Sequence, residues 1–424
     1  MHRDGGSVSI ESKFAMTVRI RKIRCILTAP AGIRLVIVKL ETSEPGLYGL
    51  GCATFTQRPL AVVESVEQYL DPFLRNRDID EIEDIFWSAR MSSYWRNGPV
   101  LNNALSGVDM ALWDLKGKRA AMPVYELWGG KCRQSADVYV HASGCDIPQV
   151  IERAQAWIEQ GHRHVRLQVE VPGQATYGTP SDLQPGQSVD GPTTPQSLFE
   201  PADYVRIANR LFEQARCALG EEIELLHDVH ERVPGPLALQ LARDLEPYRL
   251  FFFEDPLPPE EIDHFRLLRH HSVIPIAMGE LFNNPAEFVP LIKERLIDYI
   301  RIHLSQIGGL SAGLRVAHLC EFFGVATAWH GPGDTSPVGH AANLALDLCC
   351  HNFGIQEFTP FQEASLEVFP GGPEMRAGAL WPNDKPGLGI DIDERAAARY
   401  PFPEHPFNGA WPAIRRRDGS VVTP

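Results

Sequence analysis

The alternation of apolar and polar residues divides the first 130 residues into a strand region and a helical region. From about residue 17 to residue 56, apolar and polar positions alternate with the period of a strand, and turns containing Gly or Pro separate three such runs. Helical spacing takes over at Leu60 and recurs over residues 79–92 and 104–119. A three-stranded antiparallel meander followed by helices predicts an α+β module over residues 17–130.

Beyond residue 130, short strand-like runs alternate with helical stretches. Such runs occupy residues 138–141, 165–168, 224–230, 250–254, 274–280, 299–304, 325–330 and 355–358. Eight strand and helix units of this kind predict an α/β fold with a (β/α) barrel over residues 131–365. Chemistry in such a barrel is found at the C-terminal ends of the strands. Nearly every predicted strand here ends in a polar side chain.

Three segments lie outside this regular pattern. Residues 1–16 are polar and are interpreted as an N-terminal extension. The connection between Gln168 and Glu200 is too long and too rich in Pro and Gly for a simple connector, so we expect a lid over the site. We expect residues 366–424 to return to the N-terminal module, and Arg415-Arg416-Arg417 to form a solvated tail.

Composition and charge narrow the possible partners. The 424 residues are 44% hydrophobic and 22% charged, which is ordinary for a globular protein. A net charge of −14 argues against nucleic acid or an anionic membrane as a partner, although a bound metal can still attract a small anion. No apolar run approaches the roughly 18 residues needed to cross a bilayer. The eight cysteines are scattered, as in a reduced cytoplasmic protein, and the first residues lack a secretory signal pattern.

Three carboxylates are spaced as if they belonged to consecutive units of the barrel. Asp228, Glu254 and Glu280 follow short apolar runs at intervals of 26 residues. Acids at the ends of neighbouring parallel strands would converge and repel one another, and a hard divalent cation with oxygen ligands relieves that repulsion. The spacing therefore predicts a magnesium site. The alternative is three separately solvated acids.

Other strand ends carry candidate residues for proton transfer and substrate binding. His230 lies two residues after Asp228, so in a strand both side chains would share a face, and a histidine beside a metal is suited to proton transfer; a structural histidine is the alternative. His330 opens a Gly-rich turn and is expected to contact substrate rather than only shape the turn. For His303 we favour a structural role. The remaining candidates at strand ends are His141, Arg166, Gln168, Arg301 and Glu357.

Tyr177 lies in the predicted lid. A tyrosine becomes a usable base where a nearby cation lowers its pKa, and Arg166 at the adjacent strand end is a candidate for that cation. Arg301 offers a planar fork suited to a carboxylate or a hydroxyl group, and it could equally balance Glu280.

Several ordered motifs resemble one known family over essentially the whole chain after residue 16. The motifs are Trp95-Arg96-Asn97-Gly98-Pro99, His227-Asp228-Val229-His230, Phe253-Glu254-Asp255-Pro256, Gly279-Glu280 and Trp329-His330-Gly331-Pro332-Gly333-Asp334. With these motifs the chain resembles the enolase superfamily, and more narrowly the mannonate dehydratase subgroup, also named as D-galactonate dehydratase family members and as a starvation-sensing protein. The resemblance implies a modified (β/α)7β TIM barrel with an α+β capping domain.

The resemblance also implies a set of residue roles. Mg²⁺ would bind to Asp228, Glu254 and Glu280, Tyr177 assisted by Arg166 would be the base, and His230 would be the acid. Arg166-Leu167-Gln168 stands where many relatives carry a Lys-x-Lys pair, so a tyrosine base is specific to the subgroup. The implied substrate contacts are His141, Glu280, Arg301, His330, Asp334, Glu357 and Thr56.

One position departs from the subgroup pattern. Dehydratases of the subgroup typically show Leu-Asn-Gly in the cap loop, whereas this chain reads Phe55-Thr56-Gln57. Thr56 is shorter than asparagine and has no amide, so turnover of D-mannonate is expected to differ. We expect a Mg²⁺-dependent dehydratase of sugar acids, acting on D-mannonate or D-gluconate to give 2-keto-3-deoxy-D-gluconate.

Two other functions stay open on this scaffold. The first is a ligand-binding or regulatory protein without useful dehydratase activity, and the second is a racemase or epimerase. For the dehydratase we expect a small sugar acid as ligand, a cytoplasmic location and a homo-oligomer.

Overall fold

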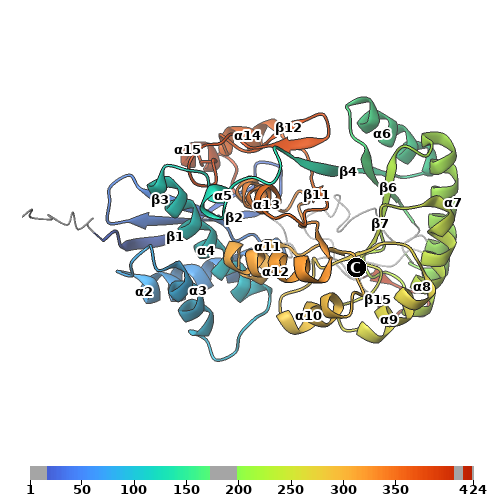
Figure 1. The fold of residues 1–424 in the computed structure, drawn as a ribbon, viewed down its shortest axis with the longest axis horizontal. Coiled ribbons are helices and arrows are strands. Elements are labelled where there is room, and N and C mark those ends of the chain that lie inside the picture. The colour runs from blue at the N-terminus through green and yellow to red at the C-terminus, as the bar shows by residue number, and fades with distance from the viewer. Residues whose placement is uncertain (1–16, 172–197, 405–413, 423–424) are drawn as a thin grey trace, which may run out of the picture.

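The cap is built on a three-stranded antiparallel sheet. The computed structural model describes residues 17–171, 198–404 and 414–422, arranged as in Figure 1 with the cap on the left. Strands β1 (Ile20–Thr28), β2 (Leu35–Thr42) and β3 (Tyr48–Cys52) pair in the order β1-β2-β3. This pairing confirms the predicted meander.

Helices cover one face of that sheet. The long helix α4 packs directly on β3, where glycines permit the contact: a Cβ on Gly51 would lie 2.0 Å from the carbonyl oxygen of Gly107. Val38 of β2 and Val108 of α4 belong to the hydrophobic core between the layers. The helices of the cap are α1 (Pro59–Glu64), the π-helix η1 (Ser65–Leu70), α2 (Asp71–Leu74), α3 (Ile82–Met91), α4 (Pro99–Ala120) and α5 (Val124–Leu127).

Eight parallel strands form the barrel. They pair in the order β10-β9-β8-β7-β6-β5-β4-β11. A bridge between Thr327 of β10 and Phe353, shortly before β11, brings the two ends of this order together. Six of the eight begin later or end earlier than the runs that predicted them. The strands are β4 (Ala136–Gly144), β5 (His164–Val169), β6 (Glu224–Asp228), β7 (Phe252–Glu254), β8 (Ile276–Met278), β9 (Tyr299–Ile300), β10 (Ala326–Thr327) and β11 (Gln356–Glu357).

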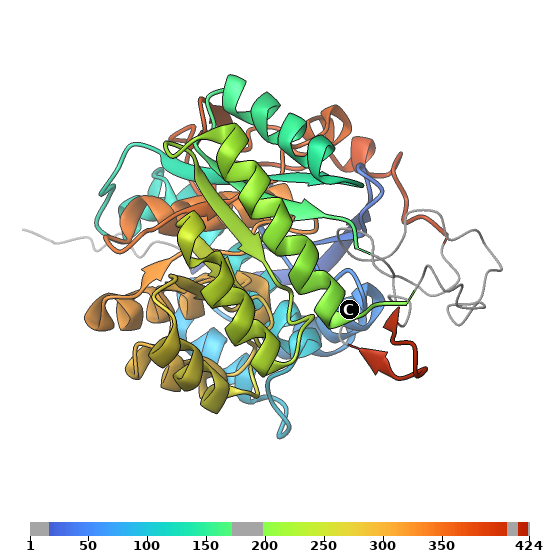
Figure 2. The same cartoon turned by 90° about the vertical axis from the view of Figure 1, so that its right-hand side faces the viewer.

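Helices connect successive strands on the outside of the barrel, as Figure 2 shows for α6 to α9. Side chains alternate along the strands: Val138 and Val140 of β4 pack among the outer core, whereas Tyr139 packs inside the barrel with Leu226 and Phe252. This arrangement confirms the predicted (β/α)7β barrel. The connecting helices are α6 (Ile147–Glu159), α7 (Pro201–Leu219), α8 (Gly235–Leu245) with the 3₁₀ turn η3 (Glu246–Tyr248), α9 (Ile262–His271), α10 (Pro285–Lys293), α11 (Leu304–Ile307), α12 (Leu310–Phe323) and α13 (Pro337–Cys349).

The segment after the barrel returns to the cap only in part. Val368 and Phe369 pack in one core with Ile26 and Ile37 of the cap sheet. The hairpin of β12 and β13 instead extends the barrel sheet, since β13 pairs antiparallel with β4. The elements of this segment are α14 (Glu363–Val368), β12 (Glu374–Arg376), β13 (Ala379–Trp381), α15 (Glu394–Ala397), β14 (Ile414–Arg415) and β15 (Val421–Val422).

The last described hairpin does not follow the expectation. Arg415 of β14 bridges to Leu198, and the N–H of Phe199 donates to the carbonyl of Arg415 at 3.0 Å. The expected return of residues 366–424 to the cap is therefore wrong for residues 414–422, which lie against the approach to α7. The arginines do not form a loose tail, because Arg415 lies in strand β14, whereas the side chain of Arg417 is exposed as expected.

Two further expectations concern the cysteines and membrane-spanning helices. All eight cysteines are free thiols. Among the described residues, no helix is both long enough and apolar enough to span a bilayer. The predicted N-terminal extension, residues 1–16, and residues 172–197 of the predicted lid lie outside the described residues.

Candidate active site

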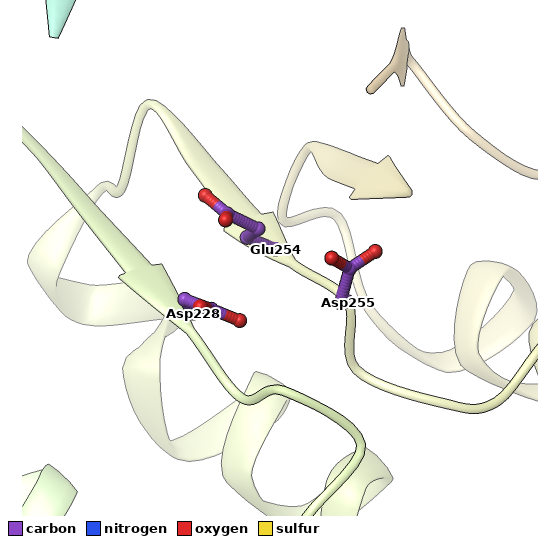
Figure 3. Close-up of side chains that lie close together, drawn as sticks. All are labelled: Asp228, Glu254 and Asp255. Atoms are coloured by element: carbon purple, nitrogen blue, oxygen red, sulfur yellow. The ribbon is translucent and has the colours of Figure 1, made fainter. Parts of the chain in front are cut away.

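Two strand-end acids meet as the spacing predicted. Asp228 ends β6 and Glu254 ends β7, and the two residues are registered partners in the sheet. Asp255 follows at once, and one oxygen from each of these three buried carboxylates lies within 4.8 Å of the others (Figure 3). Asp255 belongs to the motif Phe253-Glu254-Asp255-Pro256, but the sequence analysis assigned it no role in the site.

Glu280 occupies a different position in the site. Strand β8 ends at Met278, and Gly279, with φ of 148°, turns the chain before Glu280. Glu280 Oε2 lies 3.0 Å from His330 Nε2 and 3.2 Å from Arg301 Nη1. Among the described residues, the close group of acids consists of Asp228, Glu254 and Asp255, without Glu280. The structure therefore places Glu280 in the site next to Arg301 and His330, and not in the close group of acids.

Asp255 is already bonded on both oxygens. Its Oδ1 accepts from the N–H of Gly279 at 3.1 Å, and its Oδ2 lies 3.2 Å from Arg301 Nη1. Burial, and then repulsion by Glu280, hold the pKa of Asp255 well above its usual value. The contacts of Asp255 thus fix the turn that presents Glu280.

Two arginines offset the buried negative charge. Arg166 Nη1 lies 2.6 Å from Glu254 Oε1 and 3.4 Å from Asp228 Oδ2. Arg301 is completely buried, and its Nη2 lies 2.6 Å from Glu357 Oε2 and 3.0 Å from Glu254 Oε1. Burial raises the pKa of Glu254 to about 8 although both arginines oppose that shift. The carboxyl groups of Asp228, Glu254, Asp255, Glu280 and Glu357 outnumber the two guanidinium groups that contact them.

Tyr139 is a site residue that sequence reasoning missed. It lies on β4 with its ring inside the barrel, its hydroxyl 3.2 Å from Glu254 Oε2, and it accepts a hydrogen bond of 2.8 Å from Arg301 Nη2. Its apolar neighbours along β4 made it resemble an ordinary core residue. Only the ring of strands shows that it reaches the acids.

His230 reaches the site by a route other than the one predicted. Strand β6 ends at Asp228, and the backbone of His230 is left-handed with φ of 54°, so the argument that both side chains share a strand face is wrong. The turn is held by the N–H of His230, which donates to Asp228 Oδ1 at 2.8 Å. His230 Nε2 still lies 3.4 Å from Glu280 Oε1. The predicted proximity is present, with a different cause.

His141 and His330 contact buried carboxylates. His141 Nε2 lies 2.9 Å from Glu357 Oε1. Burial, and then Arg166, lower the pKa of His141. For His330 burial is again the largest influence and lowers the pKa, but Glu280 and Glu357 together outweigh it and raise the pKa of His330. Gly331, whose N–H donates to Glu357 Oε2 at 3.0 Å, lets the turn after His330 lie close against β11.

The cap closes one side of the cavity. Thr56 Oγ1 lies 3.5 Å from Asp334 Oδ2 in the turn after β10 and 3.0 Å from Gln57 Oε1. A cavity of about 650 Å³ separates the cap loop from the strand ends. The predicted site residues that line it are Thr56, His141, Arg166, Asp228, His230, Glu280, His330, Asp334 and Glu357.

Other residues complete the cavity wall, and some predicted ones do not reach it. His303, interpreted as structural, lines the cavity, as do Glu231 and Asp255. Arg301 and Glu254 are fully buried behind that wall. Tyr177, the predicted base, lies outside the described residues, so its position relative to Arg166 stays a prediction.

Comparison with known proteins identifies the family. Residues 13–129 match the mandelate racemase / muconate lactonizing enzyme N-terminal domain, and residues 149–396 match the enolase C-terminal domain-like family. A D-galactonate dehydratase family member from Musicola paradisiaca is 51% identical over 420 residues, covering 96% of this chain and 99% of that protein. The D-galactonate dehydratase family member RspA from Pantoea ananatis is 51% identical over 419 residues with the same coverage.

A solved structure agrees with these matches. An enolase from Pantoea ananatis, crystallised with bound D-gluconate and Mg, has a TM-score of 0.90 and 51% identity, covering 96% of this chain and 100% of that one. A structure described as a putative galactarate dehydratase from Agrobacterium radiobacter, at 24% identity and a TM-score of 0.80, shares the fold. The chain therefore belongs to the enolase superfamily, among the D-galactonate dehydratase family members.

Proposed function

We propose that this protein is a Mg²⁺-dependent dehydratase that converts D-gluconate or D-mannonate to 2-keto-3-deoxy-D-gluconate. The observation that carries the proposal is one cavity lined by strand-end carboxylates, by Arg166 and by His230. The relative from Pantoea ananatis with bound D-gluconate and Mg supports the choice of ligand and ion. The names of the curated relatives support dehydration as the reaction.

The donor set fits a hard divalent cation. Buried carboxylate oxygens within 4.8 Å of one another are the ligands that Mg²⁺ prefers. We propose Asp228, Glu254 and Glu280 as the ligands, which is the set that the family resemblance implies. Asp255, the third acid of the close group, would then hold the turn before Glu280 through its bond to the N–H of Gly279. When bound, Mg²⁺ stabilises the negative charge that develops as the proton beside the substrate carboxylate is removed.

Side chains of this chain would carry out the proton transfers. Tyr177, with its pKa lowered by Arg166, would take the proton from C2 of the acid. His230 would give the proton on its Nε2 to the hydroxyl leaving C3, which departs as water. Loss of one proton and one hydroxide leaves an enol, and the enol rearranges to the 2-keto-3-deoxy acid. The close approach of His230 to Glu280 supports this placement of the acid.

The remaining polar residues would bind the polyol chain of the substrate. His141, His330 and Asp334 line the cavity, and Glu357 joins His141 to Arg301. Thr56 would contact the substrate from the cap and help to exclude water. Arg301 is buried behind Glu280 and Glu357, so we propose that it acts by holding these two carboxylates in place.

An assay with a panel of aldonic acids tests the proposal. Purified protein with Mg²⁺ is incubated with each acid in deuterated water, and 2-keto-3-deoxy acid is measured. Product from D-gluconate or D-mannonate that disappears in a His230→Asn variant is expected. Deuterium at C2 without loss of water would identify a racemase or epimerase instead.

A ligand-binding protein without useful turnover is the second candidate. The observation that favours it is Thr56, which is joined to Asp334 and Gln57 where the subgroup has an asparagine. Tight binding of an acid with no product from any member of the panel would support this function. We also propose that the protein is a homo-oligomer located in the cytoplasm. Light scattering of the purified protein tests whether it assembles.

A further inference from the structure

Glu231 is a buried acid in the cavity wall to which the proposed reaction assigns no task. Its side chain lines the same cavity as Glu280 and His230, and only 9% of the residue is exposed. Its Oε1 has no hydrogen-bond partner among the described residues. Buried carboxyl oxygens normally have a partner, and the side chain that carries this unbonded oxygen lines the cavity, where a ligand can supply the missing group.

The backbone fixes the place of this side chain. Glu231 is left-handed with φ of 59°, directly after the left-handed His230. Its N–H donates to the carbonyl of Asp255 at 2.9 Å, which ties the turn after β6 to the end of β7. A non-glycine residue persists in this conformation where its surroundings hold it, and such positions are concentrated in ligand sites.

The charged groups around Glu231 are complementary to hydroxyl groups and not to a second anion. The groups that act most strongly on it are Glu280, Glu260, Asp228 and Glu261, all of them acidic. An ionised carboxyl accepts a hydrogen bond from a hydroxyl, and a protonated one can donate or accept. Neither form supplies the positive charge that a carboxylate would need in these surroundings.

We propose that Glu231 is a substrate-binding residue that hydrogen-bonds a hydroxyl of the polyol part of the sugar acid and thereby favours aldonic over aldaric acids. This inference rests on the proposed function and adds to it the class of acid that the cavity prefers. An aldaric acid carries a second, terminal carboxylate where an aldonic acid has a hydroxyl. An acidic wall repels the carboxylate and can hydrogen-bond the hydroxyl.

Calorimetry at saturating Mg²⁺ tests the inference with D-gluconate and D-glucarate, which differ only at the terminal carbon. Glu231→Ala should weaken binding of D-gluconate about tenfold or more, which is the usual effect of losing a hydrogen bond to such a group. It should bind D-glucarate no more weakly than wild type does. Glu231→Gln keeps a donor and an acceptor and should bind D-gluconate within about threefold of wild type. Glu222→Ala, an exposed glutamate nearby in the chain, is the matched control.

Titration with Mg²⁺ alone provides the second readout. Glu231→Ala should keep the wild-type affinity for Mg²⁺, because its role is in binding the polyol. Equal binding of D-gluconate by Glu231→Ala and wild type would overturn the inference, and so would a parallel loss of Mg²⁺ binding. If wild type binds neither D-gluconate nor D-mannonate, the proposed function itself fails and the inference falls with it.

Discussion

His303 and His330 share a short contact, with Nδ1 of one ring 2.7 Å from Nδ1 of the other. At this distance one nitrogen must donate and the other must accept. Burial, and then the charge of His330, lower the pKa of His303 to about 3, so His303 is neutral and one of its ring nitrogens can accept. Despite burial, the neighbouring carboxylates raise the pKa of His330, and a protonated His330 donates from Nδ1 to His303 while its Nε2 lies 3.0 Å from Glu280 Oε2. His303 thus orients His330 toward the cavity.

Replacing His303 with leucine should release His330 from this orientation. The Nδ1–H of His330 would be left in a buried place without its acceptor, and we expect affinity for D-gluconate to fall about tenfold. Calorimetry measures the effect. His318→Leu, the same change at an exposed position of α12, should bind as wild type does. Unchanged affinity in His303→Leu would mean that His303 has only a structural role.

Thr56→Asn tests whether the cap loop limits turnover of sugar acids. Threonine places one hydroxyl near Asp334, whereas an asparagine amide reaches further and both donates and accepts. We expect kcat/KM for D-mannonate to rise about tenfold, the gain that one additional hydrogen bond supplies. Thr17→Asn, an exposed position at the start of the cap, should leave kcat/KM unchanged. A decrease in Thr56→Asn would show that Thr56 itself suits the natural substrate.

Removing Arg301 should destabilise the whole barrel. Arg301 is completely buried and contacts Glu357 and Glu254, so Arg301→Met would leave buried carboxylates without a counterion. Loss of one partner in such a cluster costs about 3–5 kcal/mol of unfolding free energy. Denaturation curves measure this loss, with Arg399→Met in an exposed ion pair as a control that should change little. An Arg301→Met variant as stable as wild type would contradict the role assigned to the cluster.

Asp109 gives the contact between cap and barrel a pH dependence. It lies on α4 and accepts a hydrogen bond of 2.8 Å from the N–H of Ser311 at the start of α12. Burial raises the pKa of Asp109 from 3.8 to about 7, although its hydrogen bonds to Ser311 oppose the shift. The folded protein then binds a proton that the unfolded chain has lost. The stability from this group is full below pH 4 and is lost as pH rises to about 7.

The variant Asp109→Asn should remove that dependence. Relative to the variant, wild type should lose up to about 1.4 kcal/mol of unfolding free energy per pH unit as pH rises from 4 to 7, and nothing further above it. Denaturation of both proteins between pH 5 and pH 8 measures the difference. Parallel curves across this range would show that Asp109 is ionised in the folded protein throughout.

The arrangement of strands could be predicted from sequence because it depends on local apolar runs. The interval of 26 residues between Asp228 and Glu254 predicted that each ends a strand of the barrel, and the structure confirms that they are neighbours. Glu280 has the same spacing, but β8 ends two residues earlier and Gly279 turns the chain. Spacing fixes which unit an acid belongs to, whereas the following turn decides where its side chain lies.

Turns and short pairings could not be predicted because residues distant in sequence determine them. The left-handed backbone of Glu231 is held by the carbonyl of Asp255 in the next unit of the barrel. The partners of Asp255 are Gly279 and Arg301, so neither its burial nor its role is visible in the motif around it. The pairing of Arg415 with Leu198 joins strands too short to show any periodicity.

Titration of the protein with Mg²⁺ by calorimetry tests the central claim most directly, since the proposed chemistry depends on strand-end carboxylates that together hold one cation. Wild type should bind one equivalent, and Asp228→Asn and Glu254→Gln should each bind it at least about tenfold more weakly. Glu280→Gln should lose affinity as well, because Glu280 is the proposed third ligand. Binding of Mg²⁺ to Asp228→Asn and Glu254→Gln with wild-type affinity would contradict the account.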